Sequence, residues 1–387
     1  MASWRLNTRP GSDRMAVPRT EAPGVAGSVD EIRLPLVSVI VTAHNYGRFL
    51  PAALGSVLGQ SYRDLECIVV DDGSSDETPR VLERAAGSIR ALRNPTPLGQ
   101  GAASRIGFEA SSGQYVVFMD ADDMLDPHFV RDHVFVNLSS RVPVGMTSSD
   151  IYQIVDGRLV LGTGEALNAW MLGEPAASQP AFRPLGREPD GRWPFDGPDS
   201  GIVDGVRHVP PGRAEWRWSP MTGNMFRRDA LTLLLGSDRI DRLPLSTDVY
   251  LCTGASVLCG SLLIDKSLSY YRLHGRNSGV FQAQLVNTRS VRPESELSMQ
   301  ARRLLIEHLV VEADAICARL SRPDPLLAAL AAIDATLEAD GAPTHVAPCL
   351  ADHGAALAAI VGEGRLQPWR PRPSFWRRIS ARVRSRA

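Results

Sequence analysis

The sequence predicts an α/β fold in which a mostly parallel sheet is flanked by helices. Between residues 36 and 130, short apolar runs typical of buried strands alternate with segments of helical periodicity, and the connections are short. Polar residues follow three of the strand-like runs, at 42–47, 71–76 and 120–123. Because the carboxyl ends of parallel strands meet at one edge of a sheet, we expect these three clusters to form a single site.

The expected elements of this first part follow from apolar periodicity and helix-start signals. Apolar runs rich in β-branched residues predict four strands, at residues 37–42, 66–70, 89–93 and 115–119. Apolar residues at helical spacing predict three helices, at residues 48–59, 76–86 and 99–112, the second of them capped by Ser75 or Asp76.

The pattern continues less regularly beyond residue 130. We expect a helix at 129–137, a strand at 144–148 that ends just before Asp150, and a helix at 230–235. The apolar, small-residue run 249–264 reads as a buried helix, and residues 282–320 and 326–362 as further helices without recognisable chemistry.

Composition divides the chain into segments. We expect a disordered N-terminal extension at residues 1–33, which are rich in Arg, Pro, Gly and Ser, and an α/β domain at 34–280. That domain consists of halves 34–130 and 131–280, and the second half contains an aperiodic insertion at 165–218. A helical region at 281–362 and a basic tail at 363–387 follow.

Bulk composition excludes several classes of protein. The chain of 387 residues is 44% hydrophobic and 22% charged, with a net charge of −1, so the molecule as a whole gives no case for nucleic-acid binding. The five cysteines form no C-x-x-C pair, which indicates neither a zinc site nor a disulfide framework and fits a reducing, cytoplasmic location. No signal-peptide core or membrane-spanning apolar run is present.

An acidic cluster follows the fourth expected strand, in the run YVVFMDADDMLDP at 115–127. Asp120, Asp122 and Asp123 repel one another at a strand end, so they require either solvent or a divalent cation nearby. Carboxylate oxygens suit Mg²⁺ or Mn²⁺, which often bridge to the phosphate oxygens of a substrate. The plainer interpretation is a strand that runs into a polar loop.

The C-terminal tail is strongly basic. Residues 365–387 contain eight arginines and no acidic residue, and Phe375, Trp376, Ile379 and Val383 fall near helical spacing. This pattern is typical of an amphipathic helix that lies on an anionic membrane surface, as on the inner face of a cell membrane. A solvated disordered tail and a nucleic-acid-binding segment are the alternatives.

Three segments together resemble family 2 inverting glycosyltransferases, which have the GT-A fold, a Rossmann-like mostly parallel sheet. They are VSVIVTAHNYGRFL at 37–50, ECIVVDDGSSDET at 66–78 and NPTPLGQGAASRIGFEASSGQYVVFMDADDMLDP at 94–127, in the order and spacing of the family. The resemblance implies a nucleotide-binding half at 34–130 and an acceptor half at 131–280.

The resemblance also implies roles for individual residues. The loop after the first strand would line the pocket of the nucleotide base, with Tyr46 stacking on the base. This loop consists of Thr42, Ala43, His44, Asn45 and Tyr46. Asp72 would accept a hydrogen bond from the uracil N–H. Asp120 would lie near the ribose and the metal, Asp122 would bind Mg²⁺ or Mn²⁺, and Arg105 would lie near the diphosphate. The segment YYRLHGRNS at 270–278 matches the Tyr-Arg-x-His segment of the family, which makes His274 a candidate contact of the metal or the diphosphate.

Asp248 is the candidate general base by the same resemblance. It begins the helix after Ser246-Thr247, where the family usually has Glu-Asp; an aspartate at a helix start is otherwise a routine cap. The insertion would then cover the acceptor, because tryptophan faces stack on sugars, although it could equally be a plain surface insertion. Its tryptophans are Trp170, Trp193, Trp216 and Trp218.

The expected function is therefore metal-dependent transfer of a sugar, with inversion, from a nucleotide-diphospho-sugar to a hydroxyl of a glycan or a lipid-linked acceptor. A UDP-sugar donor and a role in cell-surface polysaccharide synthesis fit the family. Two alternatives stay open: a nucleotidyltransferase, which would normally carry a Gly-rich basic loop after the first strand, and an inactive sugar-binding or scaffold protein.

Overall fold

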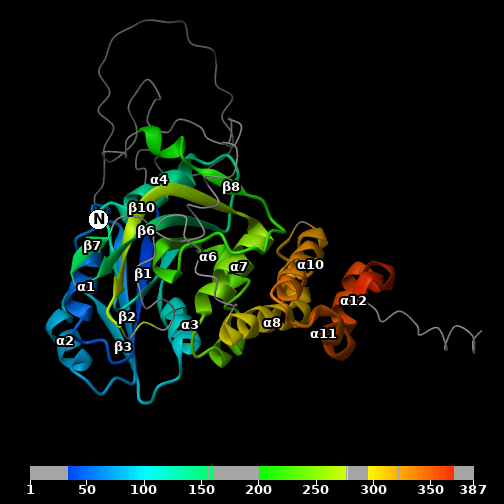
Figure 1. Ribbon diagram of the computed structural model, residues 1–387, viewed down its shortest axis with the longest axis horizontal. Coiled ribbons are helices and arrows are strands. Elements are labelled where there is room, and N and C mark those ends of the chain that lie inside the picture. The colour runs from blue at the N-terminus through cyan, green and yellow to red at the C-terminus, as the bar shows by residue number, and fades with distance from the viewer. Residues whose placement is uncertain are drawn as a thin grey trace, which may run out of the picture.

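The computed structural model describes residues 34–155, 157–160, 200–275, 277, 295–320 and 322–369. The expected extension at 1–33, residues 165–199 of the insertion and residues 370–387 of the basic tail lie outside the described residues. Figure 1 shows a central sheet with helices against it and a group of helices at one side, formed by the C-terminal part of the chain.

A sheet of ten strands forms the centre of the described structure, in the order β3-β2-β1-β4-β9-β6-β10-β5, with β7 beside β6 and β8 beside β10. The strands are β1 (Val37–Ala43), β2 (Leu65–Asp72), β3 (Arg90–Asn94), β4 (Tyr115–Asp120), β5 (Met124–Leu125), β6 (Met146–Val155), β7 (Arg158–Val160), β8 (Arg207–Val209), β9 (Asn224–Arg227) and β10 (Ser261–Leu273).

Parallel pairing brings the expected polar loops together. β1 pairs in parallel with both β2 and β4, and Thr42 lies between Val70 and Asp120 in the register. β6 and β10 form a second parallel pair, and β9 joins the two groups through antiparallel pairs with β4 and β6. The predicted α/β class with a mostly parallel sheet is confirmed.

Helices cover both faces of the sheet because its central strands are buried on both sides. In β1, Val39 and Val41 pack into one hydrophobic cluster and Ile40 into the other, as alternation along a strand requires. α1 (Leu50–Leu58), α2 (Thr78–Ala85) and α4 (Phe129–Ser139) contribute to the first cluster; α3 (Gln100–Ala110), α6 (Arg228–Thr232) and α7 (Thr247–Cys259) contribute to the second.

The C-terminal helices are α8 (Glu296–Val311), α9 (Ala313–Cys317), α10 (Asp324–Ala339), α11 (Val346–His353) and α12 (Ala355–Val361). α8 and α10 pack on α7, and the other three pack within this group. Fully buried side chains such as Leu305 of α8 and Leu330 of α10 share one hydrophobic cluster with Tyr250 of α7. These helices therefore share a core with the face of the sheet that carries α7. The short 3-10 helices are η1 (Ser200–Val203), η2 (Met221–Gly223), η3 (Asp238–Arg242) and η4 (Glu363–Trp369).

Two expectations about secondary structure are wrong. Asp150 does not follow a strand: it lies inside β6, is buried, and pairs in register with Ser267 of β10. Residues 261–264 do not extend the helix, because Gly260 ends α7 with a positive φ and β10 begins at Ser261. A continuous apolar run does not distinguish a buried strand from a buried helix by periodicity alone.

The expected sugar-stacking role is also wrong for Trp218, one of the two tryptophans of the insertion that the structure describes. Trp218 is fully buried, and its Nε1 donates to Ser261 Oγ at 2.9 Å. Trp216 packs edge-on against it, with 5.5 Å between ring centroids. The end of the insertion therefore belongs to the core, while Trp170 and Trp193 lie outside the described residues.

Candidate active site

The first two polar loops meet at the carboxyl edge of the sheet, as the sequence predicts. The ring of His44 donates from Nδ1 to the backbone carbonyl of Asp72 at 2.6 Å, and the backbone N–H of Asn45 donates to Ser74 Oγ at 2.9 Å. Thr42 and Ala43 are the last residues of β1 and lie beside β2. The loop expected to wall the nucleotide base is therefore fixed to the loop that follows β2.

Asn45 gives this loop its shape. Its φ of 59° lies in the left-handed region, where Asn is one of the few side chains that occurs with any frequency. Its Oδ1 accepts from the backbone N–H groups of Ser75 and Asp76 at 2.8 and 3.3 Å. Gly47 follows in close contact, since a Cβ there would lie 2.6 Å from the backbone nitrogen of Thr78.

Asp72 binds the chain that leads into α3. Its Oδ1 accepts from Asn94 Nδ2 at 2.7 Å and from the backbone of Leu98 at 2.8 Å, and its Oδ2 accepts from the backbone of Gly99 at 2.8 Å. The carboxylate is nearly buried, at 4% exposure. This arrangement gives Asp72 a clear role in ordering residues 94–99; its predicted contact with a uracil N–H stays a prediction.

The acidic cluster at the end of β4 combines three carboxylates. Asp120 Oδ1 accepts from Gln100 Nε2 at 2.9 Å, and Asp123 Oδ2 accepts from Thr222 Oγ1 at 2.8 Å. Burial, followed by the charges of Asp122 and Asp248, raises the pKa of Asp120 to about 7. Burial, followed by the charges of Asp122 and Asp120, raises the pKa of Asp123. The site therefore holds more negative charge than its own donors neutralise.

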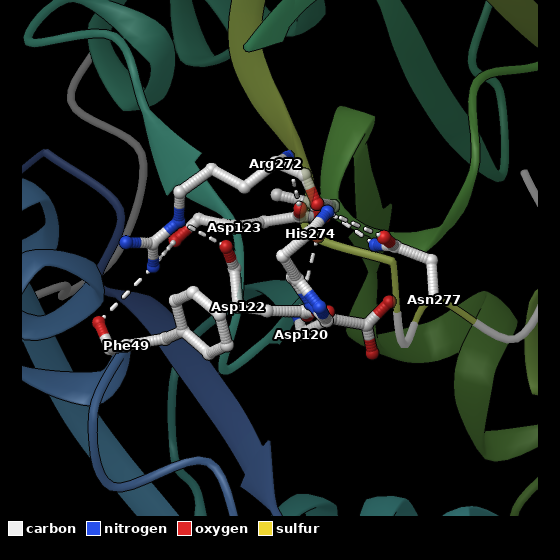
Figure 2. A network of polar contacts seen from close by, with 8 residues as sticks. Phe49, Asp120, Asp122, Asp123, Arg272, His274 and Asn277 are labelled. Atoms are coloured by element: carbon white, nitrogen blue, oxygen red, sulfur yellow. Dashed lines mark hydrogen bonds and ion pairs between the residues drawn. The ribbon is translucent and has the colours of Figure 1, made fainter. Parts of the chain in front are cut away.

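Arg272, near the end of β10, holds the backbone of this cluster (Figure 2). Its guanidinium donates to the carbonyl oxygens of Asp122 and Asp123, the latter at 3.4 Å, and to that of Phe49 at 3.0 Å. Its own backbone N–H donates to Asp123 Oδ1 at 3.2 Å. Burial lowers the pKa of Arg272, and the charges of Asp123 and Asp122 partly offset this effect. One side chain thus ties the acidic loop to the start of α1.

His274 lies on the acidic cluster, as expected (Figure 2). Its Nε2 donates to Asp122 Oδ2 at 2.9 Å. The ring stacks on Phe49 at a centroid distance of 4.3 Å, and Tyr46 approaches its edge at 5.9 Å. Asn277 accepts from the His274 backbone at 2.9 Å, which fixes the turn. The structure thus brings Tyr46, Asp122 and His274 together from three distant segments.

Asp248 is the second residue of α7, and its charge acts on the acidic cluster at the end of β4. It contributes to the raised pKa of Asp120, although 128 residues separate the two in the chain. Its Oδ1 accepts from the backbone of Val249 at 2.9 Å. Ser246, just before α7, has a φ of 62°, a conformation that costs energy for most side chains and needs surrounding structure to hold it.

Arg105 lies elsewhere. Its guanidinium makes two hydrogen bonds to Asp241, at 2.8 and 2.6 Å, and one to Glu109 at 2.6 Å. The hydrogen bonds to Asp241 are the main reason that its pKa is raised. The structure thus gives Arg105 two carboxylate partners on the outer side of α3, and its predicted contact with the diphosphate stays a prediction.

Sequence reasoning assigned no role to four residues that build the site. They are Phe49, Gln100, Thr222 and Arg272. Thr222 links two acids, since it donates to Asp123 and accepts from the Asp120 backbone at 3.2 Å. Phe49, Gln100 and Arg272 lie within segments that resemble the family, which is the only signal the sequence offers for them. Their contacts, and those of Thr222, come from tertiary pairing that no local pattern reveals.

Comparison with known proteins finds similarity to glycosyltransferases. Residues 38–136 match the family model described as Glycosyl transferase family 2. An uncharacterized glycosyltransferase of Nostoc sp. is 28% identical over 272 residues, which cover 68% of this chain and 72% of the relative. Residues 38–136 thus match family 2 glycosyltransferases, as the sequence resemblance implied.

More distant similarities cover smaller parts or share less sequence. The UDP-Glc:alpha-D-GlcNAc-diphosphoundecaprenol beta-1,3-glucosyltransferase WfgD of Escherichia coli is 29% identical over 33% of this chain and 49% of its own length. The solved structure of S. aureus TarS 1-349 in complex with UDP-GlcNAc is 15% identical, with a TM-score of 0.47, and the match covers 84% of this chain and 81% of that one.

Proposed function

We propose that the protein transfers a sugar, with inversion, from a nucleotide-diphospho-sugar to an acceptor hydroxyl, and that a divalent cation assists. The observation that carries this proposal is the arrangement of acids on one edge of the sheet. Asp120 and Asp122 follow β4, and Asp248 contributes its charge to Asp120 from α7. In such an arrangement, one set of carboxylates can hold the cation that stabilises the leaving diphosphate, and a separate carboxylate can take the proton of the incoming hydroxyl.

The donor set fits Mg²⁺ or Mn²⁺ bound together with a diphosphate. Among the described residues, no three His, Cys, Asp or Glu side chains form a ready-made metal cage. Mg²⁺ commonly uses one or two protein carboxylates together with substrate phosphates. Asp122 and Asp120 would supply those carboxylates. Burial, and after it the charges of Asp122 and Asp248, raises the pKa of Asp120, and a cation would offset those charges. Bound there, the cation would neutralise charge on the departing phosphate oxygens.

The protein groups around the acids have their own tasks. His274 and Arg272 hold the acidic loop in place, and Gln100 orients the Asp120 carboxylate. As the bond from the anomeric carbon to the diphosphate oxygen breaks, the acceptor oxygen forms the new bond from the opposite face. Asp248 takes the proton of that hydroxyl, so no covalent enzyme intermediate is required.

A UDP-sugar is the proposed donor, and a glycan or lipid-linked hydroxyl of cell-surface polysaccharide synthesis is the proposed acceptor. Support comes from the relative whose name specifies UDP-Glc and a diphosphoundecaprenol-linked acceptor. The predicted contact of Asp72, the last residue of β2, with uracil is part of this proposal.

Hydrolysis of a nucleotide-sugar panel tests this function. We expect release of UDP from at least one of UDP-glucose, UDP-galactose and UDP-GlcNAc in the presence of Mn²⁺, with water as acceptor, and none after chelation of the metal. Release of GDP from GDP-mannose alone would redirect the donor assignment. Consumption of a nucleoside triphosphate with a sugar phosphate would instead identify a nucleotidyltransferase, and inactivity with every substrate would favour a binding or scaffold role.

We further propose that the basic tail 363–387 binds anionic membrane surfaces. No helix within the described part of the chain is long and apolar enough to cross a membrane. Residues 365–387 contain eight arginines, with Trp369, Phe375 and Trp376 interleaved among them. We expect the full chain to co-sediment with vesicles containing phosphatidylserine, but not with phosphatidylcholine vesicles, and to lose binding at high salt. Unchanged sedimentation after truncation at Gly364 would refute this role.

A further inference from the structure

The segment from Asp238 to Asp248, called the connector here, carries the proposed base. It consists of η3 and the residues that lead into α7. Ile240 and Leu243 are fully buried in the cluster that α7 and α8 share. The connector therefore lies between α3 on one side and α8 on the other, and its position sets where α7 begins.

The contact with α3 is unusually close. The backbone N–H groups of Gln100 and Gly101 donate to the carbonyls of Pro244 and Leu243, both at 3.0 Å. A Cβ on Gly101 would lie 1.9 Å from the carbonyl oxygen of Ile240, so only glycine allows this approach. The start of α3 is thus bonded to the connector through its backbone.

The same turn of α3 also holds Asp120, one of the two proposed metal-binding carboxylates. The side chain of Gln100 donates to Asp120 while its backbone donates to the connector. One residue therefore links the positions of Asp120 and Asp248.

Arg105 of α3 and Asp241 of the connector join the two segments again, about one turn further along α3. The paired hydrogen bonds of 2.8 and 2.6 Å form a fork that fixes orientation as well as distance. On the other side, Arg242 donates to Glu307 of α8 at 2.8 Å. The side chains of Arg105 and Asp241 are 22% and 27% exposed, and ion pairs with access to solvent contribute little to overall stability.

We propose that Arg105 and Asp241 are a positioning pair that holds Asp248 at its working distance from Asp120. This inference rests on the proposed function, in which Asp248 is the base. The strained backbone at Ser246 supports it, since such a conformation persists only where neighbouring contacts enforce it. Arg105 then acts on catalysis through the connector.

Asp241→Asn tests the pair, with Glu109→Gln as the matched control. Glu109 also binds Arg105 but makes no contact with the connector through that bond. We expect Asp241→Asn to lower the rate of UDP release from the UDP-sugar that the panel selects by about tenfold or more, because a misplacement of 1 Å can cost about 10²-fold. Arg105→Lys keeps the charge but loses the fork and should show a similar defect. The affinity for UDP with Mn²⁺, measured by calorimetry, should stay within about twofold, and Glu109→Gln should match the parent.

The double variant Asp241→Asn/Asp248→Asn identifies the route of the effect. If the pair acts through Asp248, the double variant should be no slower than Asp248→Asn alone; multiplied losses would overturn the inference. Normal turnover in Asp248→Asn would refute the proposed base itself. Loss in Asp248→Asn together with normal turnover in Asp241→Asn would leave the base standing and refute the positioning pair. Hydrogen exchange of residues 243–250 gives an independent readout: it should quicken in Asp241→Asn but not in Glu109→Gln, and unchanged exchange contradicts the proposal.

Discussion

Asp248→Asn is expected to lower turnover by about 10²–10⁴-fold while leaving donor binding intact. Asparagine keeps the shape and the oxygen that accepts from the Val249 backbone, but it cannot take a proton. A general base acts mainly in the transition state, so its loss should reduce turnover far more than affinity for the donor. The residues proposed to bind the nucleotide lie in 34–130, outside α7.

Steady-state transfer or hydrolysis, measured alongside calorimetric binding of UDP with Mn²⁺, checks this prediction. Asp265→Asn is a suitable control, because it makes the same chemical change at an exposed position of β10. Turnover of the Asp248 variant within about threefold of the parent would remove it as the base. A parallel loss of nucleotide affinity would show a structural defect instead.

Asp122→Asn is expected to abolish the metal-dependent part of nucleotide binding. Loss of even an outer-shell partner of a metal commonly costs about 10–100-fold in metal affinity, so loss of a direct carboxylate ligand should cost at least about 100-fold. Asparagine still offers an oxygen to His274 Nε2, so the contact that holds the loop should survive.

Titration of UDP in the presence and absence of Mn²⁺ measures this effect. Asp126→Asn is the matched control: it alters another acid of the same loop, whose carboxylate accepts from the His128 backbone and from the Tyr270 hydroxyl. The parent and the Asp126 variant should gain affinity on addition of Mn²⁺, and the Asp122 variant should not. Equal affinities for UDP in the presence of Mn²⁺ in all three proteins would refute the assignment of Asp122 as a metal ligand.

The sequence predicted the features that follow from strand geometry. The polar loops at 42–47, 71–76 and 120–123 meet because parallel strands end at one edge, and bonds such as His44 to Asp72 confirm it. His274 lies on Asp122, and its predicted contact with the metal or the diphosphate stays a prediction. In these cases the local pattern and the parallel arrangement decide the position.

The positions of Trp218, Arg105 and Asp150 depend on which distant residues they contact in the folded protein. The local sequence pattern does not determine those contacts. The sequence allows Trp218 to face a sugar or the core; in the structure it lies in the core, where its Nε1 donates to Ser261 Oγ. Arg105 hydrogen-bonds to the carboxylate of Asp241, which lies 136 residues away in the chain. Asp150 lies within a longer strand because β10 extends β6 by pairing with it in parallel.

Arg272 of β10 and His274 just after it hold the acidic loop, and both are synthesised long after that loop. His274 follows Asp122 by 152 residues, so at about 5–20 residues per second it emerges roughly 8–30 s later. During that interval the nucleotide-binding half can pair β1, β2 and β4, but its three carboxylates lack Arg272 and His274. The nascent chain therefore carries an unfinished, highly charged strand end, and cations or chaperones that shield it would favour productive folding.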